Sequence, residues 1–350
     1  MKKTLRYVTD TTAALIITPE NRRYLTGFES SLGYLLMTKN GSILFVDGRY
    51  FEAAVNRATN CEVVLLEKLT EQLNAECQRL GINKIIIETE NEISLFEHLK
   101  KNLNTKVTPS KSLSDKLVTM RSVKKRDEVA SIVAAQRIAE KAYDDVLNFI
   151  KVGITEREIA AFLEYKMKLY GCEKTAFETI VVSGKNSSQP HGVPTDKKVE
   201  NGDFITLDFG AVINGYCSDM TRTVAVGFAT DEMRRVYNTV LSAQNKVVET
   251  VSAGVLCSDV DRAAREIIEA AGYGKFFSHS TGHGVGLQIH EKPTLSPKSG
   301  DIKLRVGQVV TDEPGIYMPG KFGVRIEDML LVQKNGCKNL TKATKDLIIL

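Results

Sequence analysis

The sequence predicts an α+β protein with two domains: a smaller α/β domain, followed by a larger domain in which helices back a curved antiparallel sheet. The length of 350 residues is typical of about two domains. Up to residue 118, short apolar runs alternate with helical patterns, whereas residues 119–350 combine long amphipathic helices with two predicted β-hairpins. We therefore expect one domain over residues 1–118 and a second over residues 119–350.

The elements of the first domain follow from short apolar patterns. Apolar or β-branched runs predict strands over residues 34–37, 42–46, 62–66 and 84–88. Helical patterns predict helices over residues 49–58, 70–80 and 94–102. The stretch from 102 to 114 is polar and contains Pro109, so we expect a connector there.

Longer amphipathic helices are predicted in the second domain, over residues 127–151, 155–170, 231–253 and 258–271. Thr155 and Glu158 form a capping box at the start of the second of these helices. The main strands of this domain are predicted in two hairpins, over residues 204–226 and 309–332. Helices are placed similarly around both hairpins, which indicates an internal duplication.

The first hairpin carries two aspartates around a tight turn. Asn214-Gly215 is a strong signal for a two-residue type I′ loop. Counting outward from this loop places Asp208 opposite Thr221 and puts Asp208 and Asp219 on one face, as diagonal neighbours about 7 to 8 Å apart. Two such carboxylates repel unless a cation lies between them, and their oxygens suit divalent metals. The alternative is a pair of surface aspartates on a solvated edge.

The second hairpin carries two glutamates around Pro319-Gly320. A two-residue turn there would put Glu313 and Glu327 on opposite faces. A three-residue loop closed over residues 319–321, or a bulge, sets the glutamates opposite each other, and we expect one of these. In that register Arg325 shares the face of Glu327, either as part of a site or as a simple ion-pair partner.

Histidines gather in one glycine-rich segment, which holds His279, His283 and His290. The spacing of His279 and His283 would suit a zinc site on a helix, but three nearby glycines make a helix costly, so we expect a loop or strand. A neutral imidazole there would add a nitrogen ligand to the carboxylates. His191 lies apart, before a glycine, and each histidine has a purely structural role as its alternative. His98 keeps that structural interpretation.

Composition excludes several classes of function. The formal net charge of +4 is small and spread along the chain, so no nucleic-acid partner is expected. The basic run Lys124-Lys125-Arg126 is followed at once by two acidic residues, which is typical of a solvated helix start.

No membrane span and no secretory signal are expected, because the charged start Met1-Lys2-Lys3 is followed only by a short apolar stretch at residues 13–17. The six cysteines show no paired spacing, which favours reduced thiols and a cytoplasmic location. Cys217 shares a strand face with Asp219, and we interpret it as a packing residue.

Five motifs of the second domain resemble those of the pita-bread metallopeptidases. They are TLDFG at 206–210, SDMTRT at 218–223, TGHGVG at 281–286, EPGIY at 313–317 and RIED at 325–328. Within that family the chain most resembles the aminopeptidase P and prolidase branch. The strings YLTGF at 24–28 and DGRY at 47–50 resemble that branch's amino-terminal creatinase/prolidase-like domain, so the resemblance covers essentially the whole chain.

The resemblance implies a metal site with five ligands. Asp208 would bind one ion, Asp219 and Glu327 would bridge both, and His283 and Glu313 would bind the other. The implied cofactors are two divalent metal ions, of which Mn²⁺ is expected first, while Co²⁺, Zn²⁺ or Fe²⁺ also suit such ligands. A hydroxide that bridges the two ions would be the nucleophile at neutral pH.

The implied reaction is hydrolysis of the bond between an amino-terminal residue and proline. Glu313 would help to accept the water's proton, and His191 and His290 would stabilise the oxyanion. His279 would line the pocket, and Arg325 would orient a bridging carboxylate. The implied partners are short peptides with proline at the second position and a second copy of the chain in a homodimer.

Three functions stay open at this point. We expect first an Xaa-Pro aminopeptidase acting on peptides of several lengths. The alternative is an Xaa-Pro dipeptidase, or prolidase, which must recognise a free carboxylate. Prolidases often carry arginine where this chain has Thr294, although Lys292 or Arg325 could replace it. The third function is a non-catalytic peptide-binding homologue, whose sign would be lost ligands, and no ligand is lost.

Overall fold

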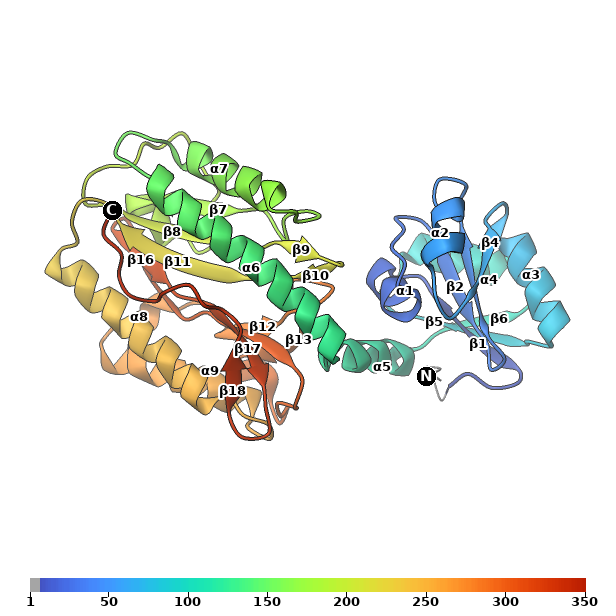
Figure 1. Cartoon of the computed structure of the whole chain (residues 1–350). Coiled ribbons are helices and arrows are strands. Elements are labelled where there is room, and N and C mark those ends of the chain that lie inside the picture. Colours follow the sequence, from blue (N-terminus) through green and yellow to red (C-terminus); the bar gives the residue numbers. More distant parts are fainter. Residues whose placement is uncertain (1–6) are drawn as a thin grey trace. The chain divides into compact units, whose positions relative to one another are not determined.

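The computed structural model describes residues 7–350, which divide into two compact units on either side of Arg121 (Figure 1). The α+β class and the two-domain architecture are therefore confirmed. The expected boundary at residue 118 lies inside helix α5 (Lys111–Ser122). The charged start at residues 1–3 lies outside the described residues.

The amino-terminal unit is built on a six-stranded sheet in the order β4-β3-β2-β1-β5-β6, in which β2 runs antiparallel to its neighbours and the other pairs are parallel. Its strands are β1 (Thr12–Ile16), β2 (Tyr34–Met37), β3 (Ser42–Val46), β4 (Glu62–Leu65), β5 (Lys84–Ile87) and β6 (Lys106–Pro109). Its helices are α1 (Pro19–Thr26), α2 (Phe51–Arg57), α3 (Leu69–Leu80), α4 (Ile93–Asn102) and α5. Successive residues of β1 enter two different apolar cores, because helices cover both faces of the sheet.

The prediction of a connector at residues 102–114 is wrong. This stretch forms β6 and the start of α5. Val107 pairs with Ile85 as part of an edge strand, and Pro109 ends that strand, where its missing N–H interrupts no inner ladder. Strand β1 and helix α1 were also missed, because β1 is too short and too uniformly apolar to show a period.

The carboxy-terminal unit places pairs of helices over curved antiparallel strands (Figure 1). Its helices are α6 (Arg126–Phe149), α7 (Glu156–Leu169), α8 (Asp231–Thr250) and α9 (Cys257–Ala270), with 3₁₀ turns η1 (Gly184–Ser188), η2 (Gly274–Phe276) and η3 (Pro297–Ser299). The capping box of Thr155 and Glu158 is confirmed at the start of α7. Helices α6 and α7 share one apolar core with the sheet β11-β8-β7, and α8 and α9 share another with the second hairpin.

The strands of this unit form two main sheets and two short hairpin ends. The sheets follow the orders β11-β8-β7 and β13-β12-β14-β17-β18, and the short ends are β10-β9 and β15-β16. The strands are β7 (Ile180–Ser183), β8 (Phe204–Phe209), β9 (Val212–Ile213), β10 (Tyr216–Cys217), β11 (Met220–Ala225), β12 (Gly282–Gly284), β13 (Glu291–Leu295), β14 (Val309–Asp312), β15 (Gly315–Met318), β16 (Phe322–Arg325), β17 (Asp328–Val332) and β18 (Cys337–Asn339).

The interpretation of Lys124-Lys125-Arg126 as a solvated helix start is wrong for its first residue. Lys125 and Arg126 are exposed, but Lys124 is buried and pairs with Glu291 at 3.0 Å. A partner so far along the chain leaves no local sequence signal.

All six cysteines are free thiols, as expected. Cys217 packs in an apolar cluster with Val285 and Met329, in agreement with a packing role. Among the helices of residues 7–350, none combines the length and apolarity needed to cross a bilayer. The cytoplasmic location stays a prediction.

Candidate metal centre

The first hairpin has the register that the sequence predicts. Asn214 and Gly215 have φ angles of 50° and 73°, so both are left-handed, as a type I′ loop requires. Ile213 pairs with Tyr216, and the same count continues to the pair of Asp208 and Thr221. The loop therefore sets which face the two aspartates share.

The second hairpin closes through a three-residue loop, as predicted. Met318 pairs with Phe322 across residues 319–321. The same register joins Gly315 to Arg325 and, farther along, Asp312 to Asp328. Glu313 and Glu327 therefore stand opposite each other between these two ladders.

The backbones of the two glutamates connect the hairpin to its neighbours. The N–H of Glu313 donates to the carbonyl of Thr281 at 2.8 Å, and the N–H of Glu327 donates to the carbonyl of Thr221 at 3.1 Å. These bonds fix the glutamate hairpin against both the histidine segment and the aspartate hairpin. The four carboxylates and His283 are thereby brought to one centre.

His283 lies on strand β12, not on a helix, as expected from its glycine neighbours. A Cβ at Gly282 would lie 2.2 Å from the carbonyl oxygen of Thr311, and one at Gly284 would lie 2.6 Å from that of Lys292. Only glycine permits this close approach. Nδ1 of His283 faces the carbonyl of Gly284 at 3.1 Å and must carry the proton, so Nε2 is left for a ligand.

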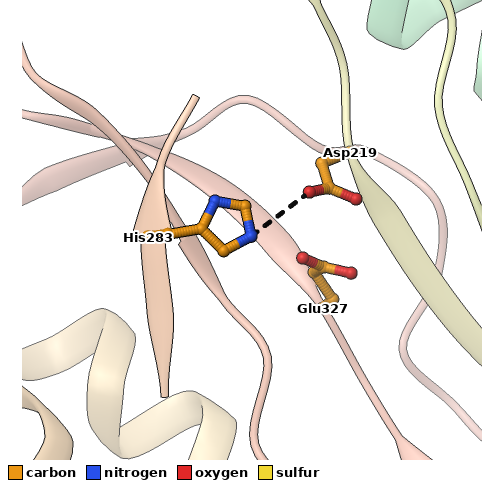
Figure 2. A group of neighbouring side chains, drawn as sticks. All are labelled: Asp219, His283 and Glu327. Carbon is orange, nitrogen blue, oxygen red and sulfur yellow. Dashed lines mark ion pairs between the residues drawn. The ribbon is translucent and has the colours of Figure 1, made fainter. Parts of the chain in front are cut away.

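Three side chains from three separate segments of the chain converge, as Figure 2 shows. Ligand atoms of Asp219, His283 and Glu327 all lie within 4.8 Å of one another. Nε2 of His283 lies 3.7 Å from Oδ2 of Asp219 and 3.4 Å from Oε1 of Glu313. This mixture of carboxylate oxygens and one imidazole nitrogen suits a divalent transition metal.

Asp208 adds a carboxylate of which only one oxygen is hydrogen-bonded within the described residues. Its Oδ2 accepts a hydrogen bond from Nη2 of Arg325 at 2.6 Å. Its Oδ1 is buried and has no hydrogen-bond partner among residues 7–350. An uncompensated buried oxygen is costly, and a bound cation would satisfy it.

Electrostatics also fits a cation at this centre. Burial, together with Glu327 and Asp208, raises the pKa of Asp219 well above its usual range. Burial likewise raises the pKa of Glu327 and, to about 8, that of Glu313. Burial and the neighbouring His290 lower the pKa of His283 to about 4, so its imidazole is neutral. A cation among these acids would stabilise their charged forms, and the neutral imidazole offers it a nitrogen ligand.

Arg325 donates hydrogen bonds to several side chains around these candidate ligands. Besides Asp208, it donates from Nε to Oγ1 of Thr221 at 3.1 Å and from Nη1 to the hydroxyl of Tyr317 at 2.7 Å. Oγ1 of Thr221 in turn donates to Oε2 of Glu327 at 2.6 Å. The guanidinium thus contacts Asp208 directly and reaches Glu327 through Thr221.

His279 is linked to Arg325 by hydrogen bonds through the Tyr317 hydroxyl. Its Nδ1 faces the carbonyl of Ser280 at 2.8 Å, so Nδ1 carries the proton and Nε2 accepts from the Tyr317 hydroxyl at 2.9 Å. Burial and the charge of Arg325 lower the pKa of His279 to about 4, which keeps the ring neutral. A Cβ at Gly315 would lie 2.4 Å from the Tyr317 hydroxyl oxygen, so glycine makes room for that ring.

The sequence reasoning did not assign a role to Tyr317 or Thr221. Strand alternation could have identified Tyr317, because it lies four residues after Glu313 and therefore on the same face of the hairpin. Thr221 lies opposite Asp208 in the predicted register. A hydroxyl next to a carboxylate could have indicated that Thr221 forms a hydrogen bond within the site.

The remaining histidines lie at the rim of the centre. The ring of His290 makes an edge contact with His283, with centroids 4.3 Å apart. His191 is exposed, and the carbonyl of the preceding residue, Pro190, accepts a hydrogen bond from Nη1 of Arg325 at 3.2 Å. His98, in contrast, lies on α4 of the amino-terminal unit, where it contacts Asn102.

Comparison with known proteins covers both units. Residues 130–334 match metallopeptidase family M24, and residues 9–123 match the creatinase/prolidase amino-terminal domain. A protein of Pyrococcus horikoshii named Xaa-Pro dipeptidase is 41% identical over 337 residues, which cover 96% of this chain and 94% of that protein.

Two similar solved structures are an Xaa-Pro dipeptidase from Bacillus anthracis and an X-Pro aminopeptidase from Thermotoga maritima. The first has a TM-score of 0.92 and 39% identity, and covers 97% of this chain and 95% of its own. The second has a TM-score of 0.91 and 38% identity, with coverages of 97% and 98%.

Proposed function

The chain belongs to metallopeptidase family M24, and from that premise we propose that it is a metal-dependent Xaa-Pro peptidase that acts first on Xaa-Pro dipeptides. The observation that carries the proposal is the convergence of Asp219, His283 and Glu327, with Asp208 and Glu313 beside them. The dipeptide stands ahead of longer peptides because proteins named Xaa-Pro dipeptidase predominate among the similar proteins described above. This reverses the order expected from the sequence.

Five side chains would hold two divalent ions, expected to be Mn²⁺. These side chains are Asp208, Asp219, His283, Glu313 and Glu327, which supply four carboxylates and one imidazole nitrogen. When bound, the ions would polarise the substrate carbonyl and activate water at neutral pH.

Other roles in the reaction fall to side chains of the protein, which would hold the metal ligands in place and transfer protons. The carboxylate of Glu313, which lies 3.4 Å from Nε2 of His283, is placed at the centre to accept the proton of an attacking water. Arg325 holds Asp208 and, through Thr221, Glu327 in fixed orientations. His279 cannot be the base, because both of its ring nitrogens are already in hydrogen bonds.

The substrate bond is a tertiary amide without an N–H, so recognition must rely on the proline ring and the chain ends. A dipeptidase also needs a cation for the substrate carboxylate. Arg325 is buried and committed to Asp208, Thr221 and Tyr317. The exposed Lys292 is therefore our candidate for that cation.

The second candidate is an Xaa-Pro aminopeptidase. The observation that favours it is Thr294, which pairs with His283 and supplies no positive charge. The similarity to the T. maritima X-Pro aminopeptidase also supports it.

A comparison of Ala-Pro with Ala-Pro-Gly tests the proposal. The purified chain, loaded with Mn²⁺, should hydrolyse Ala-Pro with the higher kcat/KM and should leave Ala-Ala intact. A higher kcat/KM on the tripeptide would establish the aminopeptidase instead. No activity on either peptide, with metal bound, would reject both and revive the peptide-binding homologue.

A further inference from the structure

A buried ion pair links two segments that lie far apart in the sequence. Nζ of Lys124 lies 3.0 Å from Oε2 of Glu291, and the two side chains are 1% and 3% exposed. Removing both charges from water is costly, so such a pair persists only where its geometry is well fixed. Glu291 directly follows His290 and begins strand β13.

The Glu291 carboxylate organises the loop that precedes it. Oε1 accepts a hydrogen bond from the N–H of Gln288 at 3.3 Å. A Cβ at Gly286 would lie 2.5 Å from Oε2, so glycine leaves the space that the carboxylate fills. The N–H of Gly286 also donates to the carbonyl of Gln288 at 3.0 Å, which makes residues 286–291 a compact turn around the acid.

Lys124 is itself anchored to the sheet that carries the glutamate ligands. Its backbone N–H donates to the carbonyl of Gly307 at 2.8 Å, and Val123 forms a bridge with Gln308. Strand β14, which leads to Glu313, begins at the next residue, Val309. The ammonium group is therefore held at a fixed place relative to the metal ligands.

The loop places the ring of His290 in contact with that of His283, a candidate metal ligand. The rings of His290 and His283 meet edge to face, and Glu291 pairs with Gly284, the neighbour of His283. We propose that Lys124 and Glu291 are positioning residues that set His290 against His283 for the reaction. The pair acts through the loop, and its catalytic consequence rests on the proposed function.

A charge-removing variant with a matched control tests the pair. Lys124→Met keeps most of the side-chain volume and should lower kcat on Ala-Pro about tenfold, with little change in KM, because His290 is displaced. Lys124→Arg keeps the charge and should restore part of kcat. The control is Lys125→Met, at the exposed neighbouring lysine, and should behave as wild type.

A double-mutant cycle separates positioning from general destabilisation. In a His290→Ala background, Lys124→Met should change kcat less than about twofold, because the residue on which the pair acts is gone. An equal loss of kcat in both backgrounds would overturn the proposal. Glu291→Gln, which keeps the shape of the side chain, replaces Lys124→Met in the cycle if that variant does not fold.

Histidine NMR distinguishes failure of this inference from failure of the proposed function. In the protein with ring-labelled histidines, Lys124→Met should shift the His290 and His283 signals and leave His98 unchanged. The same shift in a protein without Xaa-Pro activity would reject the proposed function and retain the positioning role. Unchanged His290 and His283 signals would reject the positioning role.

Discussion

Glu313 and Glu327 stand opposite each other at a break in the hydrogen-bond ladder of their hairpin. The pairs on either side, Asp312 with Asp328 and Gly315 with Arg325, share one register, so no bulge separates them. The glutamate N–H groups instead donate sideways to Thr281 and Thr221. The break is thus the point at which the hairpin is joined to the other ligand-bearing segments.

The register of the hairpin that closes at residues 319–321 should determine metal binding. Insertion of one alanine between Arg325 and Ile326 leaves the loop and the pairing of β15 with β16 unchanged, but moves Glu327 one position along the chain and turns its side chain to the other face. We expect affinity for Mn²⁺ to fall on the order of 100-fold or more, measured by titration calorimetry. Lys321→Ala loses the exposed ion pair with Glu232 but keeps the register, so its affinity should be normal. Wild-type affinity in the insertion variant would contradict the register argument.

Local rules were sufficient for the hairpins. The pair Asn214-Gly215 fixes its register through two left-handed residues, and parity alone required an odd loop between Glu313 and Glu327. Both inferences use only neighbours in sequence and the two-residue period of a strand. These rules placed Asp208 with Asp219 and Glu313 with Glu327, whereas the expectation that both pairs meet His283 came from the resemblance of the motifs to a known family.

Contacts between distant segments could not be anticipated in the same way. Lys124 and Glu291 are 167 positions apart, and His279 and Tyr317 are 38 apart, so no period relates them. The basic run at Lys124 even indicated a solvated face. Burial of these groups depends on packing of whole elements, which residue patterns alone do not encode.

Catalysis should depend on the hydrogen-bond geometry of the Arg325 guanidinium as well as on its positive charge. Arg325→Met leaves Asp208, Thr221 and Tyr317 without their donor, and we expect kcat on Ala-Pro to fall about 100-fold at saturating Mn²⁺. Arg325→Lys keeps a charge but cannot serve three partners at once, so kcat should recover only partly. Full recovery with lysine would show that geometry is unimportant. Metal content measured on each variant excludes simple loss of ions.

The Tyr317 hydroxyl should matter as the link between Arg325 and His279. Tyr317→Phe removes both hydrogen bonds, and we expect about a tenfold lower kcat with a loss of stability of about 1–2 kcal/mol. Tyr237→Phe is the matched control, because this buried tyrosine also donates a hydrogen bond, to the carbonyl of Lys345. It should lose similar stability but keep kcat. Equal kcat in the two variants would argue against the link.

The left-handed conformation at residue 214 should be worth about 1 kcal/mol of stability. Asn214→Ala places an ordinary L side chain at φ 50°, whereas Asn214→Gly tolerates that angle. Both variants lose the amide contact with Ser131, so their difference isolates the backbone strain. Urea unfolding should find the alanine variant less stable than the glycine variant. The opposite order would mean that the loop is not type I′ in solution.

The metal-free protein should lose stability as the pH rises from about 5 to about 8. Burial raises the pKa of Asp219, Glu327 and Glu313, the last from 4.5 to about 8, so the folded state holds protons that the unfolded chain releases. Each such group costs about 1.4 kcal/mol per pH unit between its unfolded and folded pKa values, and the loss is complete above the folded pKa. His283 has the opposite sign: its pKa is lowered to about 4, so its contribution is lost as the pH falls below 6.5.

These two windows overlap, and because the three carboxylates outnumber the imidazole, the metal-free protein should be most stable near pH 5, at the low end of the carboxylate window. Saturating Mn²⁺ replaces the protons on the carboxylates and should remove the decline at higher pH. Thermal unfolding at pH 5.5, 7.0 and 8.5, with chelator and with Mn²⁺, measures both effects. A midpoint that rises with pH in the presence of chelator would mean that the carboxylates are already compensated without a cation, and would remove the electrostatic basis for the metal centre.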